Sequence, residues 1–347
     1  MTAPVSKARC CELDALRILA CFFVVVIHTA NRLPWGPMSQ ATWWGCNLYS
    51  ALVRSAVPLF LMISGANFLS RPEPPEWKVL LKKYVLRLAV LYALWRLLYG
   101  IDSCGIAALR SLDGWRQILT TEPKYHLWFL PKMITAYLLL PVLWLIARER
   151  NGKYLDGCLL GGILLYFLSQ TLRNLPLGGS LSGLLTAFEY PMNSFLLYML
   201  LGYRLSSRES KLGLLPLLLG FGLSALAAAG LNGWLSLRKG GLDDTMYNLQ
   251  TVFSMTEASC IFLLFRRWGQ RRPFGCRKLL TELSAGTLGV YLLHVFLLEH
   301  LQQWLGGPLS TVSPLISIPL LSLAVFGLCM AISCLIRRIP WVGKWIM

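Results

Sequence analysis

The chain has 347 residues, of which 56% are hydrophobic and only 14% are charged. Soluble proteins carry charge on about 25% of their residues, and no recurring period marks a soluble helical repeat, so the composition excludes both classes. The net charge of +17 would suggest a nucleic-acid partner for a soluble protein. Here the basic residues lie mostly between apolar runs, as the positive-inside rule describes for membrane proteins. We expect an all-α, polytopic membrane protein that binds no nucleic acid.

Ten apolar runs are long enough to cross a bilayer, which takes about 17–25 residues per helix. Together they predict a single helical bundle over residues 1–347, with no attached soluble domain. The ten cysteines show no metal-ligand spacing, so we expect no metal. The predicted transmembrane helices are Leu13–Leu33, Leu48–Leu69, Val79–Tyr99, His126–Ala147, Tyr154–Leu172, Glu189–Leu205, Leu212–Leu231, Tyr247–Phe265, Leu283–Leu301 and Ser313–Ile336.

The distribution of Lys and Arg predicts the orientation of these helices. With the amino terminus inside, 21 of the 33 basic residues fall in inner segments and 7 in outer loops. This bias places both termini in the cytoplasm. The longer outer loops, Asn31–Asn47 and Gly100–Tyr125, indicate that the active face is the outer one, because long loops are often functional.

The first predicted span carries Arg17 near its inner end and His28 in its outer half. At 100° per residue, eleven residues make three turns plus about 20°, so both side chains share one helix face and lie about 16 Å apart along the axis. Arg17 could simply extend its charge to the membrane surface. His28 is deeper, and ionisable groups inside a membrane usually face a cavity and mark a functional site.

The run "LDALRILACFFVVVIH" resembles the opening of the acyltransferase-3 family, bacterial integral-membrane acyltransferases that modify surface polysaccharides. The hallmark of that family is an Arg, ten residues and a His in the first span, and Arg17 and His28 match it; Asp14 matches the preceding family position. Further resemblances follow in chain order: "VPLFLMISG" (57–65), "HLWFLPKMITAYLLLPVL" (126–143), "LLGYRL" (200–205) and "LGVYLLH" (288–294).

The resemblance implies a multi-pass enzyme of the bacterial inner membrane. Its donor would be a cytoplasmic acyl-CoA, by default acetyl-CoA, with succinyl as an alternative acyl group. Its acceptor would be a hydroxyl of a glycan or glycolipid at the outer surface. Arg17 and the pair Lys83 and Arg87 would hold the phosphates of coenzyme A, although the family more often has Arg at the position of Lys83.

The same resemblance makes His28 the general base that removes the proton of the acceptor hydroxyl, and His294 the second histidine. The pKa of an imidazole lies near neutrality, so its free base is available. An acyl-histidine intermediate is a variant of this mechanism. The pantetheine arm of coenzyme A is comparable in length to the rise of about 16 Å from Arg17 to His28.

Five further side chains are candidates with an alternative structural role. Ser64 could serve close helix packing, and Arg54 and Glu257 could form structural ion pairs or contact the acceptor. His126 and Trp128 could belong to an interfacial belt or to a sugar site. A transporter of a small polar substrate is the alternative function, but the sequence lacks the two similar halves that transporters often have.

Overall fold

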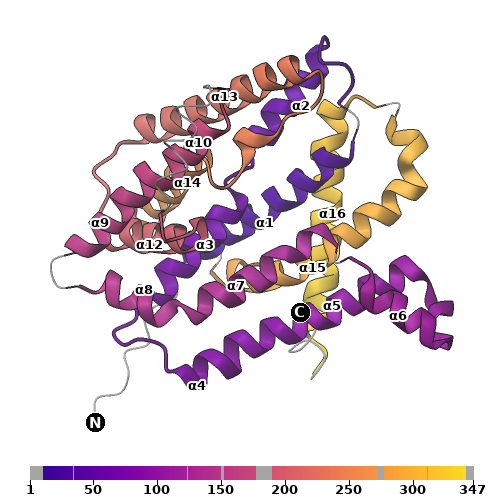
Figure 1. Ribbon diagram of the computed structural model, residues 1–347, viewed down its shortest axis with the longest axis horizontal. Helices are drawn as coiled ribbons and strands as arrows, with labels where there is room; N and C mark the ends of the chain where they lie inside the picture. Colours follow the sequence, from indigo (N-terminus) through magenta and orange to yellow (C-terminus); the bar gives the residue numbers. More distant parts are fainter. Residues whose placement is uncertain are drawn as a thin grey trace.

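The computed structural model describes residues 11–33, 35–122, 124–149, 152–176, 190–271, 277–310 and 312–340. Every regular element in these ranges is a helix, which confirms the predicted all-α class (Figure 1). In chain order they are α1 (Cys11–Arg32), α2 (Ala41–Leu52), α3 (Ala56–Phe68), α4 (Trp77–Val79), η1 (Leu80–Val85), α5 (Leu86–Cys104), η2 (Ile106–Arg110), α6 (Leu112–Thr120), η3 (Tyr125–Trp128), α7 (Phe129–Leu138), α8 (Leu140–Ala147), α9 (Lys153–Gly161), η4 (Gly162–Leu168), α10 (Ser169–Arg173), α12 (Ser194–Ser207), α13 (Leu214–Lys239), η5 (Thr245–Tyr247), α14 (Val252–Arg271), α15 (Arg277–Ser310) and α16 (Pro314–Arg337).

Within the described ranges, seven helical stretches are long and apolar enough to cross a membrane. They are α1, α2 with α3, α4 with η1 and α5, α9 with η4 and α10, α13, most of α15, and α16. The number becomes eight if η3 and α7, bent by 57° from α8, form one span with it. The predicted number of ten is therefore not confirmed.

When η3, α7 and α8 are counted as one span, the two remaining predicted spans that are not among the candidates are α12 and α14. α12 has 14 residues, so it is about 21 Å long, whereas the hydrocarbon core of a bilayer is about 30 Å thick. α14 has 20 residues, but Ser, Thr, Glu, Arg and Gln interrupt its apolar sequence. α12 packs on α3 and α14, and α14 packs on α1 and α13, so neighbouring helices cover their polar groups. Glu189, the predicted start of the sixth span, lies outside the described residues.

Three helix irregularities place side chains of the later site. α2 and α3 are separated by residues 53–55, so Arg54 lies in a break within one candidate span. The bend between α7 and α8 is explained by Pro141 in the first turn of α8, because proline cannot continue the hydrogen bonding of a preceding helix. η1 is a π-helical turn that carries Lys83, and such turns are frequent at functional sites.

The core is tightest where α3 crosses α12. A Cβ atom added to Gly65 would lie 1.8 Å from the carbonyl oxygen of Met199, and one added to Gly202 would lie 2.1 Å from that of Met62. The two backbones therefore touch, as small residues allow between membrane helices. The largest apolar cluster of the described residues surrounds this crossing.

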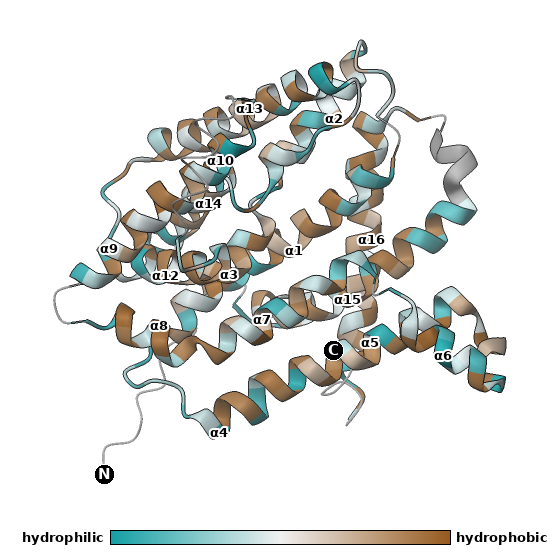
Figure 2. Cartoon of the chain, in the orientation of Figure 1, coloured by the Kyte–Doolittle hydropathy of each residue, from teal (hydrophilic) through white to brown (hydrophobic). Residues whose placement is uncertain are grey.

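The outer faces of several helices are apolar, as Figure 2 shows for α5 and α13. α13 exposes one leucine row along a single face: Leu215, Leu219, Leu223 and Leu226 are between 52% and 66% exposed. Residues three and four apart share a helix face, and exposed apolar side chains in a continuous row suit contact with lipid. The structure thus agrees with a multi-pass membrane protein.

Candidate active site

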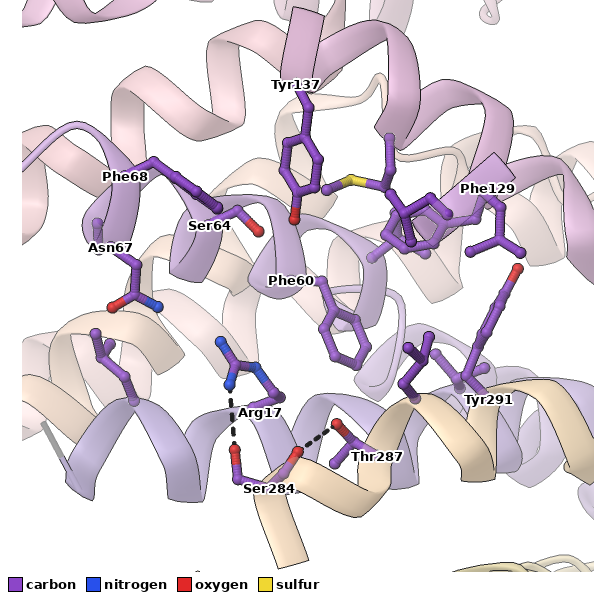
Figure 3. A pocket seen from close by; sticks show the side chains of 18 of the residues that line it. Arg17, Phe60, Ser64, Asn67, Phe68, Phe129, Tyr137, Ser284, Thr287 and Tyr291 are labelled. Carbon is purple, nitrogen blue, oxygen red and sulfur yellow. Dashed lines mark hydrogen bonds between the residues drawn. The ribbon is translucent and has the colours of Figure 1, made fainter. Parts of the chain in front are cut away.

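One cavity of about 1270 Å³ runs through the bundle, with walls from α1, α3, α7 and α15 (Figure 3). It exceeds the range of about 300–1,000 Å³ that is usual for small-molecule sites. His294 and Glu257, two of the eleven predicted site residues, do not line it. The other nine do: Asp14, Arg17, His28, Arg54, Ser64, Lys83, Arg87, His126 and Trp128.

Arg17 and His28 both face this cavity, as their predicted position on one helix face requires. α1 runs without interruption from Cys11 to Arg32, so its eleven-residue spacing again corresponds to about 16 Å along the axis. Both residues line the cavity from the same helix, so the Arg17 end and the His28 end of this wall are separated by about three helical turns.

Three histidines meet at the far end. The ring centroid of His294 lies 5.1 Å from that of His28 and 5.2 Å from that of His126. The ring centroid of Tyr125 lies 5.0 Å from that of His28. His28 and His126 line the cavity, whereas His294 is fully buried behind them. The three rings come from α1, η3 and α15.

The surroundings of His294 decide where its proton lies when the ring is neutral. Its Nδ1 is 2.7 Å from the carbonyl oxygen of Tyr291 and 3.2 Å from that of Val290. Both neighbours are acceptors, so Nδ1 carries the hydrogen and Nε2 keeps the lone pair. Nε2 is buried and has no hydrogen-bond partner among the described residues. It is therefore a free acceptor within the histidine cluster.

An ion cluster, not anticipated from the sequence, holds the histidine end together. The carboxylate of Glu299 on α15 accepts from Arg32 at 2.6 Å and from Lys124 at 2.8 Å. Arg32 Nε also donates to the hydroxyl of Tyr125 at 3.4 Å. The cluster ties the end of α1 and the start of η3 to α15. In the sequence, the only indication of this cluster is that Arg32, Lys124 and Glu299 are opposite charges at the ends of separate apolar runs.

The opposite end of the cavity is cationic. Arg17 is held by Ser284, whose hydroxyl accepts from the Arg17 guanidinium at 3.2 Å and donates to Asp14 at 2.7 Å. Asp14 also lies 3.7 Å from Arg17, so it serves to orient this arginine. Six cations line this end: Arg17, Arg71, Lys83, Arg87, Arg266 and Arg337.

Arg71, Arg266 and Arg337 were missed by sequence reasoning, which assigned them only to inner loops. The Arg71 guanidinium stacks on the ring of Phe68 at 4.6 Å and donates to the hydroxyl of Tyr84 at 3.2 Å. Arg266 pairs with Glu12 at 2.7 Å. These residues lie far apart in the chain, and only the packing of α3, α14 and α16 around α1 brings them to one cavity.

Aromatic side chains line the cavity between Arg17 and Tyr291 (Figure 3). Phe60 projects from α3 towards Phe129, with ring centroids 6.3 Å apart. The hydroxyl of Ser64 points towards that of Tyr137 on α7. Ser64 thus faces the cavity, while the adjacent Gly65 makes the close contact with α12. Trp128, 42% exposed, closes the wall beside Phe129.

Arg54 and Glu257 do not form an ion pair within 4.0 Å among the described residues. Nε of Arg54 donates to the carbonyl oxygen of Ser50 at 3.2 Å, and its guanidinium stacks on the ring of Tyr247 at 4.7 Å. Glu257 is buried in α14, and its Oε2 has no hydrogen-bond partner in the described chain. No three His, Cys, Asp or Glu side chains in these ranges are grouped to hold a metal ion.

The comparisons with known proteins fit this geometry. A family model described as an acyltransferase domain matches residues 12–337, which include all nine predicted residues that line the cavity. No similarity to a curated protein or to a solved structure was found. The match does not support the transporter alternative. Since it spans nearly the whole chain, this protein belongs to the acyltransferase-3 family of membrane acyltransferases.

Proposed function

We propose that this protein is a membrane O-acyltransferase. It moves an acyl group, by default acetyl, from cytoplasmic acyl-CoA to a hydroxyl of a glycan or glycolipid at the opposite membrane surface. The observation that carries the proposal is one continuous cavity with six cations at one end and two histidines at the other. Both termini are in the cytoplasm in this proposal, and the membrane is the bacterial inner membrane, as the positive-inside bias and the family suggest.

The cavity suits a donor with an anionic head and a thin, uncharged arm. The phosphates of coenzyme A would pair with Arg17, Lys83 and Arg87 and with the further arginines at that end, since charge-assisted bonds to phosphate are the strong ones. The arm would pass Phe60 and Phe129 in the aromatic middle. Its thioester would then reach His28, about 16 Å from Arg17 along α1.

His28 would act as the general base. The acceptor oxygen forms a bond to the thioester carbonyl carbon while its proton passes to His28. The tetrahedral intermediate then collapses, the carbon–sulfur bond breaks, and the coenzyme A thiolate takes the proton back from His28. The free Nε2 of His294 can accept a hydrogen bond from the protonated His28 ring, whose centroid is 5.1 Å away, and so stabilise its charge.

The test replaces His28 with Ala. Purified protein in lipid should still bind coenzyme A, because the cationic end is intact. In cells that carry only the variant, the rate at which acyl esters are added to surface glycans should fall roughly 10²–10⁴-fold, the usual contribution of a positioned base. Alkali-labile acyl groups on the glycans, measured by mass spectrometry, give the readout.

The matched control is Arg17→Ala, at the other end of the same helix face. Its coenzyme A affinity should fall by about 1.5–3 kcal/mol for the lost charge-assisted contact. Substantial acyl transfer by His28→Ala would remove the catalytic assignment. Wild-type cells without any glycan-bound acyl ester that depends on this protein would remove the proposed function itself.

A further inference from the structure

A second cavity of about 480 Å³ adjoins the histidine end of the first. Its walls come from the segment after α1 and from the loop that follows α13. Asn31 and Arg54 line both cavities, so they form the boundary between them. Asn31 lies three residues beyond His28 on α1, and residues at this spacing share a helix face. The second cavity thus leads to His28 from the side opposite to the cationic end.

The lining of this cavity combines flat apolar surfaces with polar groups. Trp35 and Trp43 are 9% and 4% exposed, with ring centroids 5.8 Å apart. The indole N–H of Trp35 donates to the carbonyl oxygen of Ala30 at 2.8 Å, so the part of this residue left for contact with a ligand is its apolar ring. Asp244 adds a carboxylate at the exposed rim. Apolar walls with a few placed polar groups are typical of small-molecule sites, and the volume lies in their usual range.

Arg54 is the strongest indication of a ligand. Its guanidinium lies in the break between α2 and α3, where Nε is satisfied by Ser50 and the plane rests on Tyr247. The two terminal nitrogens make no hydrogen bond and no ion pair within 4.0 Å with any described residue, and Arg54 lines both cavities. Asp244 and Glu257 are the carboxylates that act on this charge electrostatically. A charge at this depth is costly and is usually retained for a partner or a substrate.

We propose that the second cavity binds the acceptor, and that Asn31 and Arg54 hold it so that its hydroxyl reaches His28. This inference rests on the proposed function. The chemistry of the walls fits a saccharide: sugar rings can lie against indole faces, while hydroxyl or carboxylate oxygens accept from Arg54 and hydroxyl hydrogens are donated to Asp244. Donor and acceptor then approach His28 from opposite ends and bind at the same time.

The test fills the second cavity without touching the first. Leu242 lines only the second cavity and is 54% exposed at its rim, so Leu242→Trp blocks the site with little risk to folding. Leu237→Trp, at a position 56% exposed on the nearby α13 and lining neither cavity, is the matched control. Arg54→Gln removes the cation at the junction. Cells lacking their own copy of the protein express each variant, and alkali-labile acyl groups on their glycans are measured.

Leu242→Trp and Arg54→Gln should each lower glycan acylation at least about tenfold, as expected for a blocked site or a lost charge-assisted contact. The affinity of purified Leu242→Trp for coenzyme A should stay within about twofold of wild type, and Leu237→Trp should match wild type in both measurements. Wild-type acylation by both Leu242→Trp and Arg54→Gln would overturn the proposal. So would a parallel loss of coenzyme A affinity in Leu242→Trp, since the two cavities would then not be separate sites. Failure of the proposed function is distinct, because the wild-type protein itself would then add no acyl groups.

Discussion

Glu299→Gln is the perturbation that tests how the histidine end is held. Glu299 belongs to none of the predicted site residues, yet its carboxylate joins Arg32 and Lys124 at 2.6 and 2.8 Å. These two cations flank Tyr125, whose ring lies 5.0 Å from that of His28. Replacing the carboxylate by an amide of the same shape removes the charge that binds η3 and α1 to α15.

The magnitude follows from the exposure of the three side chains. Glu299 is 17% exposed, Arg32 26% and Lys124 23%. Breaking a fully buried ion pair costs about 3–5 kcal/mol, and an exposed pair contributes about 0–1 kcal/mol. The contribution of a partly buried cluster lies between these limits, and glutamine keeps some of the hydrogen bonds. We therefore expect the free energy of unfolding to fall by about 1.5 kcal/mol. If this loss displaces the histidine rings, we expect the rate of acyl transfer to fall about tenfold.

Thermal unfolding in detergent and glycan acylation in cells measure the two effects. The melting temperature and the acylation rate should both fall, while coenzyme A affinity stays unchanged because the cationic end is remote. Asp156→Asn is the matched control: its pair with Arg204 is short, at 2.5 Å, but Asp156 is 50% exposed, so little change is expected. Wild-type stability and a wild-type acylation rate in Glu299→Gln would show that this ion cluster does not hold the histidine end in place.

Four further predictions concern other parts of the molecule. Gly65→Ala should destabilise the protein by about 1–3 kcal/mol, because the added Cβ would lie 1.8 Å from the Met199 carbonyl oxygen. The control in the same thermal unfolding experiment is Gly222→Ala on α13, whose added Cβ would meet nothing within 4 Å. Arg71→Gln should weaken coenzyme A binding about tenfold or more if the cationic end holds phosphates, whereas an unchanged affinity measured by calorimetry would exclude this arginine from the donor site. Partial burial alone would raise the pKa of Asp243, but hydrogen bonds from Thr245 and the nearby Lys239 hold the pKa of that carboxyl below its ordinary value. The stability that this carboxylate contributes is present above the unfolded pKa near 4 and is lost as pH falls through the folded pKa. The melting temperature of Asp243→Asn should therefore lack this decline in acid. Single cysteines in residues 100–120 should react with a membrane-impermeant thiol reagent from outside, and cysteines in residues 266–271 only from inside; labelling of both from one side would contradict the proposed orientation.

The features that could be predicted from the sequence are those that depend on residues close together along the chain. Apolar runs predicted helices, because a chain in lipid must satisfy its backbone hydrogen bonds internally. The eleven-residue spacing of Arg17 and His28 predicted a shared face, since helical periodicity is fixed by local geometry, and α1 places both in one cavity. The predicted spans at α12 and α14 are not confirmed, because α12 is short and the sequence of α14 is interrupted by polar residues, while neighbouring helices shield both.

Which residues from distant parts of the chain meet depends on the packing of the helices. The convergence of Arg71, Arg266 and Arg337 on Arg17, and the stacking of His126 and His294 beside His28, depend on how each helix is rotated about its axis and placed beside its neighbours. Hydropathy carries little information on this rotation, because lipid and protein neighbours are both apolar and packing, rather than a difference in hydrophobicity, selects the contacts between membrane helices. The second cavity at Arg54 likewise arises from loops that approach one another only when α1, α2 and α13 are assembled.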